Sequence, residues 1–352
     1  MEAAVQLEEA DETALREEAE AVRRRRKRCH LRSGSSGDAR WTRALRSGDQ
    51  DEGDETALRQ EAEGVRQRRL KMAAPAPNAF SGHLEKWILE KSKQSIFFIN
   101  IMHDPECTEE LKELVETVDH VPEDERDALF NGEGHTATGF VVQEGPHYFK
   151  ILTCAHVIGH VFSADHPLSR DDANRMFITQ VICDHYEMSF RRPGQDIHPN
   201  RVYAQGHIIG LSCRDDLMLI QVPRADVMNL DEICLRNHPH LPFSQTCPVA
   251  FDNCVMVSWP PLRHRTAVKG CVSHTSRSFN DLGEDNPVGY RINLLEVKIA
   301  SEEGSSGAPL LNGNGKVIGM LHGGFGGPFS YFVRIADIIP FLVQRGVILR
   351  HD

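Results

Sequence analysis

The chain has 352 residues, 40% of them hydrophobic, and carries a formal net charge of −11 at pH 7. This is enough apolar material for a sizeable core, and no run approaches the ~18 apolar residues that a membrane-spanning helix needs. Acidic and basic side chains balance over the first 75 residues, so the negative charge falls on the remainder. An acidic body is a poor nucleic-acid binder. Neither a membrane nor a nucleic acid is therefore expected as a partner.

Residues 1–77 form a charged tail with an internal duplication. Residues 11–16 recur as residues 54–59, each copy with acidic residues early and arginines late, which matches a helix dipole. Their apolar stripe is too thin for a core, so the tail is expected to be disordered or to form isolated helices. The basic run from Arg23 to Arg28 is either the solvated end of a helix or a nuclear localisation signal.

Two further features of the N-terminal part bear on where the protein acts. Its first residues do not resemble a signal peptide, so we expect an intracellular protein, cytoplasmic or nuclear. Met72 is a second candidate translation start, which would make the tail optional.

Residues 78–222 are predicted to form a first unit, followed by a linker over residues 223–246. Apolar spacing predicts short helices over 83–93 and 109–118, the second with Thr108 as its N-cap. Short apolar runs bounded by Gly, Pro, Asn and Asp predict strands in this unit. These strands fall at 95–101, 138–142, 149–153, 176–183, 205–210 and 217–222.

Residues 247–352 contain a second set of predicted strands and a closing helix over 335–344 that Pro340 interrupts. A hairpin turn is expected from Asn312 to Gly315. The strands fall at 255–258, 267–273, 290–300, 310–311, 316–321 and 330–334. Two runs of about six short strands, without alternating long helices, indicate an all-β fold of two closed barrels.

Three motifs point to nucleophilic chemistry. The motif Gly304-Ser305-Ser306-Gly307 places a serine between glycines, where the backbone can turn sharply and leave N–H groups bare beside the hydroxyl. A serine nucleophile also needs a histidine base and a carboxylate that orients it. His156 closes Thr153-Cys154-Ala155-His156 at the end of a predicted strand, and Asp216 opens the apolar run of another.

Together the three motifs resemble those of the trypsin-like serine peptidases, in the chymotrypsin clan that includes the HtrA/Deg proteases. The order His, Asp, Ser is that of the chymotrypsin fold. The resemblance covers residues 80–345, and we expect no PDZ module after it. It implies two six-stranded antiparallel β-barrels with the active site in the cleft between them, a helical or disordered N-terminal extension and a C-terminal helix.

The resemblance also assigns roles. Ser306 is expected to be the nucleophile, His156 the general base and then acid, and Asp216 the carboxylate that orients the imidazole. The backbone N–H groups of Gly304 and Ser306 are expected to form the oxyanion hole. Asp215 is the alternative carboxylate, but neighbouring side chains on a strand face opposite ways, and the motif favours Asp216.

The resemblance also implies where the substrate pocket lies. Its base is expected at Ala300 and its wall at Leu321, Gly323 and Gly324. Because no acid stands at Ala300, a small or medium apolar residue is expected before the scissile bond. His322 is expected to face away from the pocket and to support Asp216 by a direct or water-bridged hydrogen bond. The alternative is a histidine that only packs between the barrels.

The sequence thus predicts a serine endopeptidase that hydrolyses peptide bonds of protein or peptide substrates through an acyl-enzyme. The alternatives are a catalytically silent peptidase-fold protein that binds peptides or partners, and a nuclear factor that acts through its arginine-rich tail. No cofactor is expected, and no metal, since the 9 cysteines include no C-x-x-C pair. Deg-like proteases are often homotrimers, so a homo-oligomer is an open alternative to a monomer.

Overall fold

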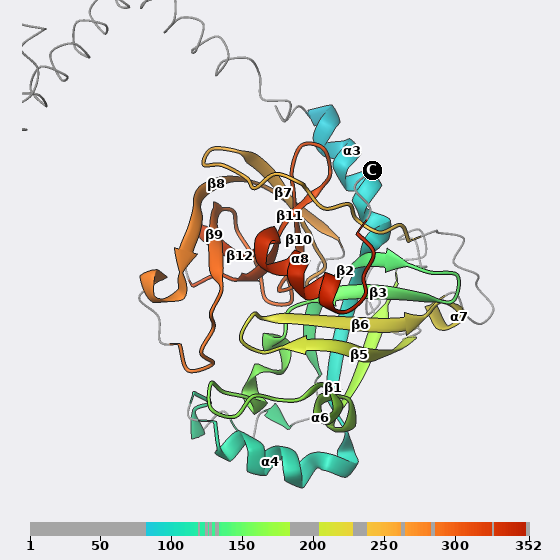
Figure 1. Cartoon of the computed structure of the whole chain (residues 1–352), viewed down its shortest axis with the longest axis vertical. Helices are drawn as coiled ribbons and strands as arrows, with labels where there is room; N and C mark the ends of the chain where they lie inside the picture. The colour runs from blue at the N-terminus through green and yellow to red at the C-terminus, as the bar shows by residue number, and fades with distance from the viewer. Residues whose placement is uncertain are drawn as a thin grey trace, which may run out of the picture. The chain divides into compact units, whose positions relative to one another are not determined.

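The computed structural model describes residues 82–118, 120–123, 126, 129–130, 134–183, 204–227, 238–261, 265–282, 286–325 and 327–349. The predicted tail over residues 1–77, with its two helices and basic run, lies outside the described residues. The described residues form two closed six-stranded barrels (Figure 1). The predicted all-β fold of two antiparallel barrels is confirmed.

The first barrel closes in the strand order β1-β2-β3-β6-β5-β4. Its strands are β1 (Ile96–His103), β2 (His135–Glu144), β3 (Tyr148–Thr153), β4 (Phe177–Ile182), β5 (Ala204–Ser212) and β6 (Leu217–Pro223). Strand β5 alternates buried and exposed side chains over most of its length, as an antiparallel strand with one solvated face does. Strand β6 is buried at nearly every residue, so both of its faces are covered.

The second barrel closes in the order β10-β11-β12-β9-β8-β7. Its strands are β7 (Asn253–Ser258), β8 (Thr266–Ser278), β9 (Asn293–Lys298), β10 (Pro309–Leu311), β11 (Val317–Gly323) and β12 (Phe329–Arg334). The predicted hairpin between β10 and β11 is present, and Gly315 N–H donates to the carbonyl of Asn312 at 2.9 Å. Its strands appear in the orange and red part of Figure 1.

Helices pack at the ends and sides of the barrels. They are α3 (Gly82–Ser92), α4 (Thr108–Glu116), α6 (Arg170–Met176), α7 (Arg224–Val227) and α8 (Ile335–Gln344). Figure 1 shows α4 at the end of the first barrel that is remote from the second. None of the helices among the described residues combines the length and the apolar character that crossing a bilayer requires.

Two helix details differ from the sequence expectation. The N-cap of α4 is Cys107, and the Thr108 hydroxyl instead donates to the carbonyl of Pro105 at 3.0 Å within the preceding turn. Pro340 does not interrupt α8, although it removes one backbone donor. The helix continues because its apolar face is buried against the barrels, and packing outweighs the lost hydrogen bond. The buried residues of that face are Ile335, Ile338, Phe341 and Leu342.

Candidate active site

Asp216 lies directly before β6 and is 0% exposed. Its φ of 54° is a left-handed conformation that aspartate tolerates better than most residues. Oδ1 accepts from the backbone N–H of His156 at 2.8 Å, and Oδ2 accepts from Nδ1 of His156 at 2.8 Å and of His322 at 2.6 Å. Burial raises the pKa of this carboxyl, but the imidazoles of His156 and His322 lower it by more. Asp216 is therefore a buried, fully paired anion.

Asp215, the alternative carboxylate, has a different partner. Its Oδ2 accepts from the Ser212 hydroxyl at 2.7 Å. Both residues lie in the turn before β6, where Asp216 has a left-handed backbone, so strand alternation does not apply to them and it is their hydrogen bonds that distinguish them. The expectation that Asp216 and not Asp215 faces His156 is confirmed.

His156 begins the short helical segment η3 (His156–Val161) that follows β3. Its side chain is 27% exposed, so one edge of the ring reaches the surface. The bond from Nδ1 to Asp216 fixes the tautomer with the proton on Nδ1 and leaves Nε2 as a base. Burial by itself lowers the pKa of His156, but the Asp216 carboxylate outweighs this effect and raises the pKa well above 6.5.

The nucleophile motif forms two tight turns. Ser305 N–H donates to the carbonyl of Glu302 at 3.0 Å, with Gly304 at φ +79° in the third position, the geometry of a type II turn. Gly307 has φ +84°, and a Cβ there would stand 2.2 Å from the carbonyl oxygen of Thr138. Ala308 is 0% exposed and is not among the described residues with positive φ, so its methyl group is accommodated.

The turn leaves two backbone donors free beside Ser306. Among the described residues, neither Gly304 N–H nor Ser306 N–H has a hydrogen-bond partner. The Ser306 hydroxyl donates to the carbonyl of His322 at 3.4 Å. Among the hydrogen bonds of the described residues, none joins this hydroxyl to His156. A rotation about Cα–Cβ would be needed to bring the hydroxyl to the imidazole.

Thr138 of β2 holds this turn in place across the barrel interface. Its hydroxyl donates to the carbonyl of Gly304 at 2.9 Å and accepts from Trp259 N–H at 2.9 Å. Its own N–H donates to the carbonyl of Ser306 at 2.8 Å. With both carbonyls tied to the first barrel, the N–H groups of Gly304 and Ser306 are kept free. No local motif around Thr138 indicates this role of a buried threonine.

His322 is 6% exposed and lies at a bulge in β11, where the pairing with β12 skips one residue. The predicted hydrogen bond to Asp216 is present and direct. Three aromatic rings surround the imidazole, with centroids at 5.0, 5.7 and 6.1 Å, and they belong to Tyr290, Phe279 and Phe325. The bulge lets one residue direct its side chain to Asp216 and its carbonyl to Ser306.

The predicted pocket residues separate into two groups. Ala300 and Gly324 are exposed and Gly323 is partly exposed, whereas Leu321 is 1% exposed and packs in the core of the second barrel. The side chain of Leu321 is therefore not an accessible wall. Its burial follows from the alternation that directs neighbouring His322 toward Asp216.

Two hydroxyls that the sequence analysis missed lie beside Gly324. A Cβ on Gly324 would stand 3.1 Å from Oγ of Ser301 and 3.7 Å from Oγ of Ser330. The Ser330 hydroxyl contacts Oγ of Ser301 at 2.9 Å and the carbonyl of Ile299 at 2.8 Å. No local motif indicates these two serines, because it is the pairing of β9 with β12 that brings them together.

The group His156, Asp216 and His322 also has the composition of a metal-ligand set. Here, however, Nδ1–H of His156 and Nδ1–H of His322 both donate to Asp216 Oδ2. The protonated nitrogens therefore have no lone pair to offer a metal ion. The arrangement is that of a carboxylate orienting a general base.

Comparison with known proteins agrees with this geometry. The family model for the trypsin-like peptidase domain matches residues 137–320, which is more than half of the chain. The chain therefore belongs to the trypsin-like peptidase family and is a serine endopeptidase that acts on protein or peptide substrates. A search of curated proteins finds no match to the chain.

Two of the solved structures that are similar to the chain illustrate the likeness. One is the active form of the Rv3671c protease from M. tuberculosis, with 14% identity, a TM-score of 0.47, and coverage of 76% of this chain and 88% of that chain. The other is Deg5, with 18% identity, a TM-score of 0.46, and coverage of 75% of this chain and 96% of that chain. The family assignment rests on the sequence match, and the fold on the barrel topology.

Proposed function

We propose that Ser306, His156 and Asp216 form the catalytic triad of this peptidase and that it works through an acyl-enzyme. Ser306 Oγ attacks the scissile carbonyl while Nε2 of His156 takes its proton. His156 then gives that proton to the leaving amine, and a water activated by the same imidazole hydrolyses the acyl-enzyme.

The observation that carries the proposal is the pairing of buried Asp216 with Nδ1 of His156 beside a turn that presents two free N–H groups. The backbone N–H groups of Gly304 and Ser306 are the proposed oxyanion hole, which stabilises the negative charge that develops on the carbonyl oxygen of the substrate. Proteomic cleavage-site profiling of the wild type against Ser306→Ala tests the proposal, since the triad account requires every assigned cleavage to disappear in the variant.

The substrate preference follows from the pocket. The expected base, Ala300, is itself uncharged, and the hydroxyls of Ser301 and Ser330 already contact each other, so a small or medium apolar side chain can enter without leaving a charge unpaired. We propose cleavage after residues such as Val, Ala or Leu.

Replacement of Ala300 by aspartate is expected to move the preference toward Arg and Lys, because it places a counter-charge at the pocket base. The shift should be partial, on the order of tenfold in relative kcat/KM, because loops also shape such a pocket. Matched peptides that differ only in the residue before the scissile bond measure it, with Ala300→Asn as the uncharged control. Dominant Arg or Lys cleavage by the wild type would show that Ala300 is not the base.

The rate should depend on pH through His156. Because Asp216 raises the pKa of His156 well above 6.5 and only the neutral imidazole is a base, kcat/KM should fall as the pH drops through that raised pKa. The acid limb of the profile is therefore expected to lie above pH 6.5, and Asp216→Asn should move it lower. Initial rates from about pH 5 to about pH 10 test this, and a limb centred below 6.5 in the wild type would contradict it.

His322 is proposed as a positioning residue that holds Asp216. His322→Ser should keep most of the activity, since a hydroxyl can still donate to the carboxylate, while His322→Leu should lower kcat by about tenfold with little change in KM. Steady-state kinetics of both variants distinguish this from a packing role, in which the apolar replacement would be the better tolerated of the two.

A further inference from the structure

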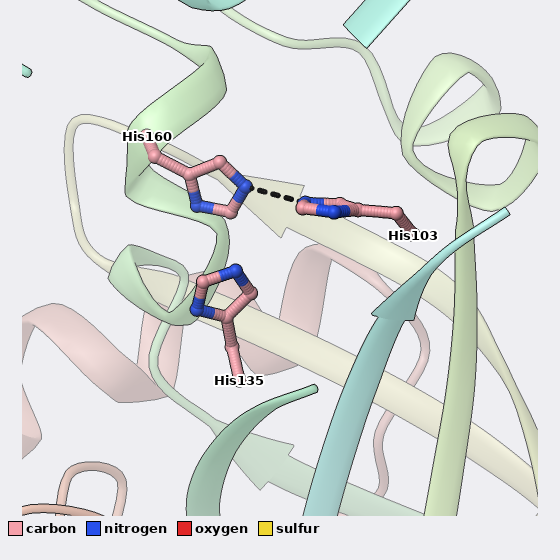
Figure 2. Close-up of side chains that lie close together, drawn as sticks. All are labelled: His103, His135 and His160. Atoms are coloured by element: carbon pink, nitrogen blue, oxygen red, sulfur yellow. Dashed lines mark hydrogen bonds between the residues drawn. The ribbon is translucent and has the colours of Figure 1, made fainter. Parts of the chain in front are cut away.

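A second cluster of imidazoles lies in the first barrel and shares no residue with the triad. Figure 2 shows His103, His135 and His160 with their rings turned toward one another. His103 ends β1, His135 begins β2, and His160 lies in η3, so three separate segments meet there. Their ligand nitrogens all lie within 4.8 Å of one another.

The nitrogens of the cluster have few other partners. Nε2 of His103 and of His160 are 2.9 Å apart and share one hydrogen bond. Nε2 of His135 is buried and has no hydrogen-bond partner among the described residues. In Figure 2 the ring of His135 presents a nitrogen toward the other two. A buried imidazole nitrogen without a partner is costly, and donating its lone pair to a metal ion would remove this cost.

The surroundings keep the three imidazoles neutral. Phe130 lies 4.9 Å from the ring of His103, and Phe177 lies 5.4 Å from His103 and 5.9 Å from His160. Burial in this apolar shell, together with the neighbouring His135, lowers the pKa of His103 to about 4, and burial also lowers the pKa of His135 and His160. Neutral imidazoles carry the lone pairs that a metal ion requires.

We propose that His103, His135 and His160 bind a divalent transition-metal ion, Zn²⁺ first among them. Three imidazoles and one water make a complete tetrahedral set for zinc, whereas the oxygen-seeking ions Mg²⁺ and Ca²⁺ find no carboxylate among these ligands. Tetrahedral ligands at about 2.1 Å from zinc stand about 3.4 Å apart. His103 and His160 therefore need to separate by only about half an ångström, and His103 is partly exposed at a strand end.

The ion would act as a brace for the catalytic histidine. His160 is four residues after His156 in the same short segment η3, and the other two ligands belong to the first barrel. A metal ion that joins them fixes η3 to the ends of β1 and β2. The expectation of no metal rested on the cysteines, and these three histidines have no characteristic spacing along the chain that would indicate a site.

Zinc binding to full-length Ser306→Ala protein, freed of metal with a chelator, tests the proposal without interference from proteolysis. Calorimetry with ZnCl₂ should give one ion per chain, and saturating zinc should raise Tm by roughly 5 °C. Co²⁺ in place of Zn²⁺ should give the visible absorption of a tetrahedral site. Adding His160→Gln or His103→Gln should weaken binding by at least about tenfold. The second variant serves if the first does not fold.

Two control variants decide where the ion binds. His207→Gln removes an exposed imidazole of the same barrel, and His322→Gln removes one near the triad. Both should bind zinc as the parent does. Absence of binding at 100 µM zinc (a concentration on the order of a weak site), equal binding by the cluster variants, or loss of binding in His322→Gln would each overturn the proposal.

Discussion

Replacement of Ser306 by alanine is expected to abolish peptide hydrolysis, lowering kcat by about 10⁶-fold. The Ser306 hydroxyl lies in the same turn as the N–H groups of Gly304 and Ser306, for which the structure gives no hydrogen-bond partner among the described residues. His156→Ala should cost about as much, and the double variant no more than either single one, since the residues act as one unit. Rates on a peptide library, with circular dichroism as a check on folding, measure these effects.

The carboxylate pair supplies the matched control. Asp216→Asn should lower kcat by about 10⁴-fold, because the amide no longer fixes the productive tautomer of His156. Asp215→Asn should stay active, as that carboxylate pairs with Ser212 and not with the imidazole. An inactive Asp215→Asn beside an active Asp216→Asn would show that the orienting carboxylate has been misassigned.

Gly304→Ala is expected to lower kcat by about 10²–10³-fold while KM changes little, the loss typical of one oxyanion donor. Gly304 has φ +79°, which alanine adopts only with strain, and a Cβ there would stand 2.5 Å from Cδ of Pro261. Either the turn distorts or Pro261 moves, and both would reorient the N–H that we propose for the oxyanion hole.

Gly82→Ala is the matched control, since its Cβ meets nothing within 4 Å and its φ is not positive. It should leave kcat unchanged. If Gly304→Ala lost stability and activity in parallel, the defect would be one of folding, so Tm is measured for both variants. Full kcat in a Gly304→Ala protein of normal Tm would remove this N–H from the oxyanion hole.

The barrels could be predicted because each strand carries its own local signal, an apolar run bounded by turn residues. The same holds for His156, Asp216 and Ser306, which stand in short motifs. His322 could also be placed, since alternation along one strand decided which face it occupies.

Features made by contact between distant strands could not be predicted. Thr138 clamps Gly304 from 166 residues away in the sequence. The three-histidine cluster depends on the register of β1 with β2 and β4, and the serines beside Gly324 on that of β9 with β12. The strand that contains Leu321 could be predicted from its local pattern. The packing of the Leu321 side chain in the core of the second barrel could not, because that core is formed by residues from several strands.

The most direct test of the account is whether Ser306 is an activated nucleophile, because its hydroxyl rests on the carbonyl of His322 and must turn to meet His156. A fluorophosphonate probe reacts with such serines, and peptide mass spectrometry locates the adduct. We expect a single adduct on Ser306 that is absent from Ser306→Ala and His156→Ala. An unlabelled, folded wild type, or labelling that persists in Ser306→Ala, would contradict it.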